Sequence, residues 1–277
     1  MRTVEDYYNE FEKKDIEIVV FVTTGFGGAM PLVGNRQVTS YFPAMIDLSV
    51  NELIETDGRI EQVVTNDAFS QKQYACFKDN GIYKLLVSKC IPKELSPNVL
   101  PSINNRYLLK KVLSSYDVTN APTELVAYRE KYLEPVSARI EGTDFLLNRR
   151  FKCYEGEFVY DGWTCQVILK LDSGSNRNAE SASLCYATIK RDIAQWVLRA
   201  KEKAAEQLLS IAVECQEDDS ELSSEVFESK LTPLQSILVK NDRSFEMSFG
   251  DSDIFGGHQI MLRGNLEDGF IDSDIVG

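Results

Sequence analysis

Residues 182–215 read ASLCYATIKRDIAQWVLRAKEKAAEQLLSIAVEC, and this stretch predicts the helical part of the fold. It contains neither Gly nor Pro, the residues that most often end a helix. Apolar side chains recur at the helical spacing of three and four: Ile189, Ile193, Trp196, Ala200, Ala204, Leu208 and Ile211. One straight helix of this length would reach about 50 Å, which exceeds an ordinary domain. We therefore expect a bend, or two helices that meet near Arg199.

Strand patterns lie on both sides of this helical stretch. Residues 151–160 and 163–171 flank an Asp-Gly turn and alternate well enough for a half-buried hairpin. A short helix capped by Ser223 or Ser224 follows the long helical stretch. Three more apolar runs follow it, at residues 235–239, 244–249 and 258–263. The second half is therefore predicted to be an antiparallel sheet packed on long helices.

The first half reads as a separate set of strands. Apolar, β-branched runs separated by turn signals occupy residues 16–22, 44–50, 82–87 and 106–113. The glycines of residues 25–28 interrupt the first run and suggest a hairpin or flexible loop. They lack the helix and Lys of a phosphate-binding loop. About five short strands in about 100 residues predict a small barrel or sandwich.

A short helix between Pro122 and Pro135 separates the two strand sets. We therefore predict an α+β protein with a small N-terminal β-barrel or sandwich-like domain, a helical linker and a C-terminal sheet on long helices. The predicted bounds are 1–118, 119–136 and 137–277.

Charge and composition limit the classes of partner. The 277 residues include 43 acidic and 30 basic side chains, for a net charge of −13 and a pI near 4.7. Nucleic-acid binding relies on clustered Lys and Arg, so this composition argues against such a partner. The N-terminus lacks the basic and apolar run of a secretory signal, and no apolar segment is long enough to span a membrane. We expect a cytoplasmic protein.

The six cysteines are not spaced for metal or redox chemistry. No two are closer than twelve residues, so the chain has no Cys-x-x-Cys pair. We expect buried, reduced thiols that pack as small apolar side chains. No cofactor is expected.

His258 is the one histidine of the chain and its sharpest candidate for chemistry. It follows two glycines, and Asp251 and Asp253 precede it by seven and five residues. These carboxylates could orient the imidazole or share a cation with it. The twelfth position from Asp251 is Leu262, so the run is not a helix–loop–helix calcium loop. The chain also has no Gly-x-Ser-x-Gly nucleophile elbow, so we favour a structural His258 in a hairpin over a catalytic or metal-binding one.

Acidic residues concentrate in the second half, which holds 25 acidic and 15 basic side chains. Such runs are either a solvated surface or a surface matched to a basic partner, because opposite charge speeds encounter. The candidate partner surface comprises Glu217, Asp218, Asp219, Glu221, Glu267, Asp268 and Asp272.

Several segments resemble a bacterial family of unknown function, numbered 2262 among such domains. The resemblance lies in FGDSDIFGGHQI at 249–260, GNLEDG at 264–269, DIVG at 274–277 and the Tyr154–Gly162 hairpin. Ser252 and Gly256 replace a Gly and a Trp of the family pattern. Residues 77–87 and 105–113 resemble the β domain that often precedes it. Related domains occur beside bacterial toxin systems, so the resemblance implies an immunity-like role.

Together these features predict a non-catalytic binding protein whose acidic surface masks a basic protein partner. The alternative is a ligand-binding protein, a metal-binding protein or an enzyme that uses His258 with Asp251 or Asp253.

Overall fold

The computed structural model describes residues 2–94, 101–215 and 222–277. The chain divides into two compact units, Met1–Glu134 and Pro135–Gly277. The hydrophobic clusters also separate, because each contains residues of one unit alone. None of the helices in these described ranges is both long and apolar enough to cross a membrane.

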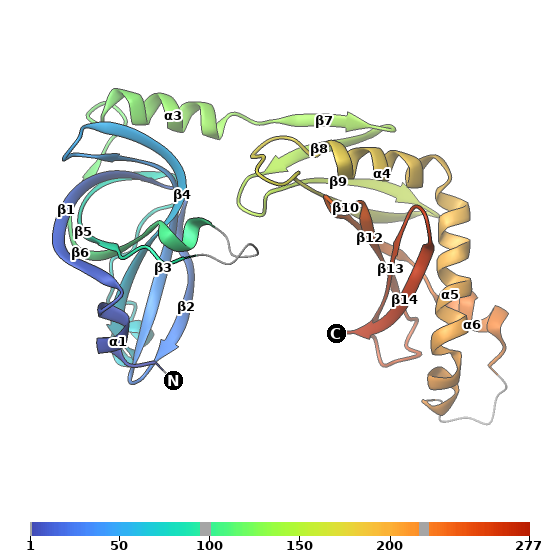
Figure 1. The fold of residues 1–277 in the computed structure, drawn as a ribbon. Helices are drawn as coiled ribbons and strands as arrows, with labels where there is room; N and C mark the ends of the chain where they lie inside the picture. The colour runs from blue at the N-terminus through green and yellow to red at the C-terminus, as the bar shows by residue number, and fades with distance from the viewer. Residues whose placement is uncertain (1, 95–100, 216–221) are drawn as a thin grey trace. The chain divides into compact units, whose positions relative to one another are not determined.

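The N-terminal unit is a closed β-barrel of five strands (Figure 1). The order around the barrel is β1-β3-β4-β6-β5, and β1 pairs with both β3 and β5. β4 and β6 are parallel, and all other neighbours are antiparallel. This is the strand order of the OB fold. The strands are β1 (Phe11–Val22), β2 (Thr24–Leu32), β3 (Asn35–Asp47), β4 (Glu52–Thr65), β5 (Gly81–Cys90) and β6 (Arg106–Tyr116).

β2 continues the sheet beyond β3 and contains the glycines that suggested a loop. The register shifts between Thr24 and Gly28, so this part of the strand bulges. A Cβ on Gly25 would lie 1.9 Å from the Phe77 carbonyl oxygen, and one on Gly27 would lie 2.0 Å from the Tyr41 ring. The glycines therefore permit close packing in one strand of the β2–β3 hairpin, so the flexible-loop alternative is wrong and the hairpin alternative holds.

The unit also has three short helical segments, and a longer helix covers part of the outside of the barrel. These are α1 (Val4–Tyr8), α2 (Asn66–Ser70), the 3₁₀ turn Pro101–Asn104 and α3 (Thr123–Leu133). α3 is the predicted linker helix. Its Leu125 is fully buried against Phe21 and Ile82, and the Tyr132 ring meets Phe21 edge-on at 5.5 Å. The first compact unit therefore includes this helix.

An ionic network fastens the N-terminal segment to the outside of β4 and β6. The Tyr7 hydroxyl donates to the buried Glu61 carboxylate at 2.5 Å. The Arg106 guanidinium lies 2.7 Å from Glu10 and 3.5 Å from Glu61. Arg2 pairs with Glu10 at 2.8 Å, and the Lys93 ammonium contacts the same carboxylate. The network thus joins four separate parts of the unit.

The C-terminal unit is one eight-stranded sheet with helices on one face (Figure 1). Its order is β14-β13-β12-β11-β10-β9-β8-β7. The strands are β7 (Ser137–Ile140), β8 (Thr143–Asn148), β9 (Cys153–Tyr160), β10 (Trp163–Lys170), β11 (Leu234–Val239), β12 (Ser244–Gly250), β13 (Gln259–Asn265) and β14 (Gly269–Val276). The helices are α4 (Glu180–Arg191), α5 (Ile193–Glu214) and α6 (Ser224–Lys230).

The structure confirms the α+β class and refines the sequence-based elements. The long helical stretch breaks at Asp192, not near Arg199, because Asp192 leaves the helical region with φ −125° and ψ 39°. Ser223 caps α6, with its hydroxyl accepting from the Val226 N–H. β10 and β11 are parallel, because the three helices carry the chain back across the sheet between them. β7, β8 and β14 were not expected.

α4 and α5 bury one apolar face of the sheet. Every third or fourth residue of α5 is buried, including Trp196, Ala200, Ala204 and Leu208, as the sequence period predicts. Trp196 meets Phe245 of β12 edge-on at 5.3 Å. Four small alanines on the buried stripe of α5 let its backbone approach the sheet: Ala200, Ala204, Ala205 and Ala212.

α5 also protects the edge of the sheet at β14. The Gln207 amide oxygen accepts from the Ser273 N–H at 2.7 Å, and its amide nitrogen donates to the Ile271 carbonyl at 3.3 Å. One side chain thus bonds to the edge strand as a further strand would. Protected edges of this kind oppose strand-to-strand aggregation.

Glu10→Gln is expected to destabilise the protein in a pH-dependent way. Desolvation raises the pKa of Glu10, but hydrogen bonds from Lys93, Arg106 and Arg2 outweigh it and lower the pKa from 4.5 to about 2. Because the pKa of Glu10 is lower in the folded chain than in the unfolded one, the ionised carboxylate stabilises the fold at pH values above the unfolded pKa. This contribution to the unfolding free energy is lost as pH falls from 4.5 towards 2. At pH 7 the variant should lose about 2 kcal/mol of unfolding free energy.

Urea unfolding at several pH values measures this difference. The difference in unfolding free energy between wild type and variant should become smaller as pH falls from 4.5 towards 2. Glu12→Gln removes an exposed charge from the same segment and serves as the control. A gap that does not change with pH would contradict the role of the Glu10 carboxylate.

Candidate functional site

The predicted site lies on residues 251–258, which join β12 to β13. Asp251 is 3% exposed. Its carboxylate accepts from the backbone N–H groups of Asp253 at 3.0 Å, Phe255 at 2.7 Å and Gly257 at 3.2 Å. Three bonds to one buried carboxylate fix the path of the loop. Asp251 is therefore a structural residue that shapes the site without facing it.

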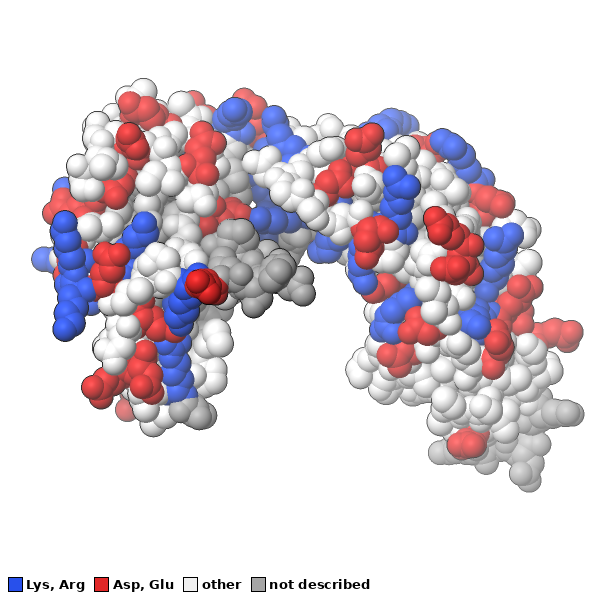
Figure 2. Space-filling view, in the orientation of Figure 1, with Lys and Arg blue, Asp and Glu red and all other residues white. Residues whose placement is uncertain are grey.

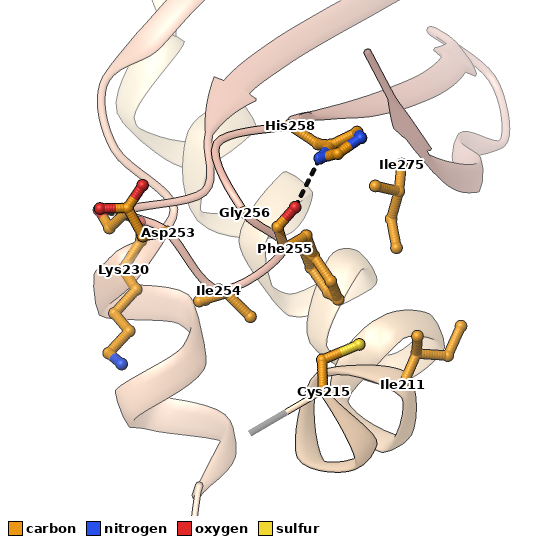
Figure 3. A pocket seen from close by; sticks show the side chains of 10 residues that line it. Ile211, Cys215, Lys230, Asp253, Ile254, Phe255, Gly256, His258 and Ile275 are labelled. Carbon is orange, nitrogen blue, oxygen red and sulfur yellow. Dashed lines mark hydrogen bonds between the residues drawn. The ribbon is translucent and has the colours of Figure 1, made fainter. Parts of the chain in front are cut away.

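His258 is exposed and held by one hydrogen bond. Its Nδ1 lies 2.5 Å from the Phe255 carbonyl oxygen. A carbonyl can only accept, so Nδ1 carries the proton and Nε2 of the neutral ring is left as an acceptor. Figure 3 shows this bond, with the other edge of the ring turned to the side on which Ile275 lies.

An open groove of about 610 Å³ runs between this loop, α6, the end of α5 and β14 (Figure 3). Apolar side chains form much of its surface. The residues that line it are Ile211, Cys215, Lys230, Ser252, Asp253, Ile254, Phe255, Gly256, His258 and Ile275.

The structure brings two of the three predicted site residues to this groove. His258 and Asp253 line it, whereas Asp251 is turned into the loop. Figure 3 shows the Asp253 carboxylate directed away from the imidazole. In the described ranges, no three His, Cys, Asp or Glu side chains gather closely enough to hold a metal ion. The arrangement can accept a hydrogen bond from a ligand, but the predicted carboxylate–imidazole pair is not assembled.

Sequence reasoning missed the other walls of the groove. Ile211 and Cys215 end α5, and Lys230 ends α6, so they reach the loop only through tertiary packing. The Ser252 hydroxyl donates to the Lys230 carbonyl at 2.8 Å, which ties the loop to α6. No spacing along the chain signals this contact.

The cysteines divide into two groups. All six are free, and Cys90, Cys153, Cys165 and Cys185 are buried as expected. Desolvation raises the pKa of Cys165 to about 12 and contributes most to values of about 11 for Cys153 and Cys185. Cys76 and Cys215 are exposed, which corrects the expectation that the thiols are buried.

The acidic candidate surface is only partly assembled. Glu217, Asp218, Asp219 and Glu221 lie outside the described residues. Asp272 pairs with Arg263 at 3.1 Å. Glu267 and Asp268 line a shallow hollow that also contains Arg199 and Lys203 of α5. In the view of Figure 2, acidic and basic side chains are interspersed on the visible side of the C-terminal unit, so the charge does not form one patch on that side.

Asp251→Asn is expected to destabilise the C-terminal unit by about 2–3 kcal/mol. The amide replaces one acceptor oxygen with a donor, so a buried backbone N–H is left unpaired. Urea unfolding measures the loss, and Asp253→Asn is the control because its exposed carboxylate forms no hydrogen bond within the described chain. Equal stability of the two variants would mean that Asp251 does not hold the loop.

Two family models match the chain and together cover most of it. Residues 143–275 match the family described as an uncharacterized protein conserved in bacteria, DUF2262. Residues 3–132 match a domain of unknown function, DUF7021. No curated protein and no solved structure gives a significant match. The resemblance found in the loop around His258 and in the first β domain is confirmed. Residues 143–275 are therefore a DUF2262 domain, and a DUF7021 domain at residues 3–132 precedes it.

Proposed function

We propose that the protein is a non-catalytic binding protein that takes a basic protein partner on its C-terminal unit. The observation that carries this proposal is the sheet face opposite α4 and α5, here called the open face. Strand alternation places the odd residues of β10, such as Val167, under the helices and the even ones, such as Ile168, on the open face.

The strand register aligns open-face residues in a continuous row. Ile168 of β10 lies opposite Glu155 of β9 and Leu238 of β11. The row continues through Glu246 and Arg263 to Asp272 of β14. Ile168 and Leu238 are both half-buried, so the centre of the row is apolar, with Glu155 on one side and charged residues on the other. Beyond Glu155 the row ends in Leu146 and Ser137. Apolar centres with polar rims are typical of protein interfaces.

Acidic side chains outnumber basic ones on the open face. Arg263 lies within 4.0 Å of three carboxylates, those of Glu246, Asp272 and Asp274. The six acidic residues are Asp144, Glu155, Glu157, Glu246, Asp272 and Asp274, against the four basic residues Arg139, Lys170, Arg263 and Lys240, the last of which pairs with Glu246 at 2.6 Å just beyond β11. A partner with a basic, partly apolar surface complements this pattern, because opposite charge speeds encounter and rejects wrong partners.

The geometry of the His258 loop supports a binding role over catalysis. Asp251 is committed to backbone hydrogen bonds, and Asp253 and His258 do not face each other. An immunity-like role against a basic toxin fits an acidic binding surface. The proposal places the protein in the cytoplasm, where free thiols such as its six cysteines persist. It does not include nucleic acid as a partner.

The test compares capture by two variants of the full chain from the native cell. Glu155→Gln with Glu157→Gln removes two open-face charges. Glu202→Gln with Glu225→Gln removes two exposed charges from the helices and is the matched control. The first variant should lose about tenfold in affinity for a basic protein at low salt, and the control should bind as wild type does.

Hydrogen exchange then locates the contact. Binding should slow exchange in β9, β10 and β13 and weaken as salt rises. Capture that is insensitive to the open-face variant, or a partner that is itself acidic, would overturn the proposal.

A further inference from the structure

The groove beside His258 is preformed. Asp251 holds three backbone N–H groups of the loop, the Ser252 hydroxyl bonds to the end of α6, and His258 bonds to Phe255. These bonds lie within the protein itself and need no ligand. A groove built this way loses little entropy when a ligand enters.

The groove offers an apolar surface to a ligand. Phe255 is 9% exposed and forms its inner wall, and Ile211 is 42% exposed at its outer side. Ile254 and Ile275 are half-buried between them. A volume of about 610 Å³ is within the range of small-molecule sites. The body of a fitting ligand is therefore aliphatic or aromatic.

The polar groups of the groove favour a hydrogen-bond donor. Nε2 of neutral His258 can only accept, because Nδ1 holds the proton. The Asp253 carboxylate also accepts, and Lys230 is the one cationic side chain among the described lining residues. Figure 3 shows the Lys230 side chain directed away from His258. The negative charge of the chain, −13, attracts a cationic donor further.

We propose that this groove binds a small amphipathic amine, with the ammonium donating to His258 Nε2 and the apolar body lying on Phe255, Ile211 and Ile275. This site is separate from the open face. A failure of one proposal leaves the other standing, because the open-face variants do not touch the groove.

Cys215 provides the measurement, because its exposed thiol lines the groove. Cys76 is exposed in the other unit and is the internal control. The full chain is alkylated with iodoacetamide, and the two rates are followed by peptide mass spectrometry. Octylamine should slow the reaction of Cys215 about fivefold through burial of its chain, and leave that of Cys76 unchanged.

Matched probes and variants identify the head group. Octanol, a neutral donor, should protect less than octylamine, and octanoate, which has no donor, should not protect. His258→Phe keeps an aromatic ring but removes the acceptor nitrogen. In this variant octylamine and octanoate should therefore have the same effect on the alkylation rate of Cys215. Glu202→Gln removes an exposed carboxylate outside the groove and should keep the preference for the amine. The proposal fails if octylamine leaves Cys215 unprotected, slows Cys76 equally, or protects no better than octanoate in the wild type.

Discussion

The packing of α4 and α5 on one face of the eight-stranded sheet determines what the C-terminal unit can present to a partner. Burial of Trp196 and the small residues of α5 against β12 and β13 uses the apolar face of every long strand. The opposite face must then be compatible with water. It carries carboxylates on β9 and β14 and half-buried side chains such as Ile168 at its centre. The packing of α4 and α5 on one face of the sheet thus forms the core and leaves the other face as the open face.

The same packing builds the groove. The C-terminal end of α5 extends to the loop between β12 and β13, and α6 returns beside it, so three segments distant in sequence meet there. Asp251 fixes the backbone path of the loop that takes part in this contact. A buried carboxylate with three backbone donors can hold a loop containing Ser252 and Asp253, both with positive φ of 45° and 67°. Left-handed backbone of this kind needs support from its surroundings.

Regular periodicity was the part of the fold that could be predicted from sequence. The spacing of Trp196, Ala200 and Ala204 predicted the buried face of α5, because that face depends on the helical period alone. The break at Asp192 depends on local backbone geometry and carries no Gly or Pro signal. β14 was missed because Asp272, Ser273 and Asp274 interrupt apolar alternation, and pairing with β13 stabilises it instead.

The candidate site could be predicted only in its location. The run from Asp251 to His258 indicated an unusual loop, and the structure places a groove there. Sequence spacing does not say whether a carboxylate turns towards backbone N–H groups or towards solvent. Asp251 turned inwards because the loop needs an acceptor for three N–H groups that would otherwise be buried unpaired. The remaining walls depend on helix packing that no local pattern encodes.

The N-terminal barrel also limits where the proposed partner can bind. OB folds bind ligands over the face of their second and third barrel strands, which are β3 and β4 here. On the outside of β4, Glu61 is fully buried beneath Tyr7. Glu10 and Arg106 extend this contact to β6. The chain's own N-terminal segment therefore occupies part of the face that other barrels of this order leave for ligands. That occupation favours the open face of the C-terminal sheet over the barrel as the surface for the proposed partner.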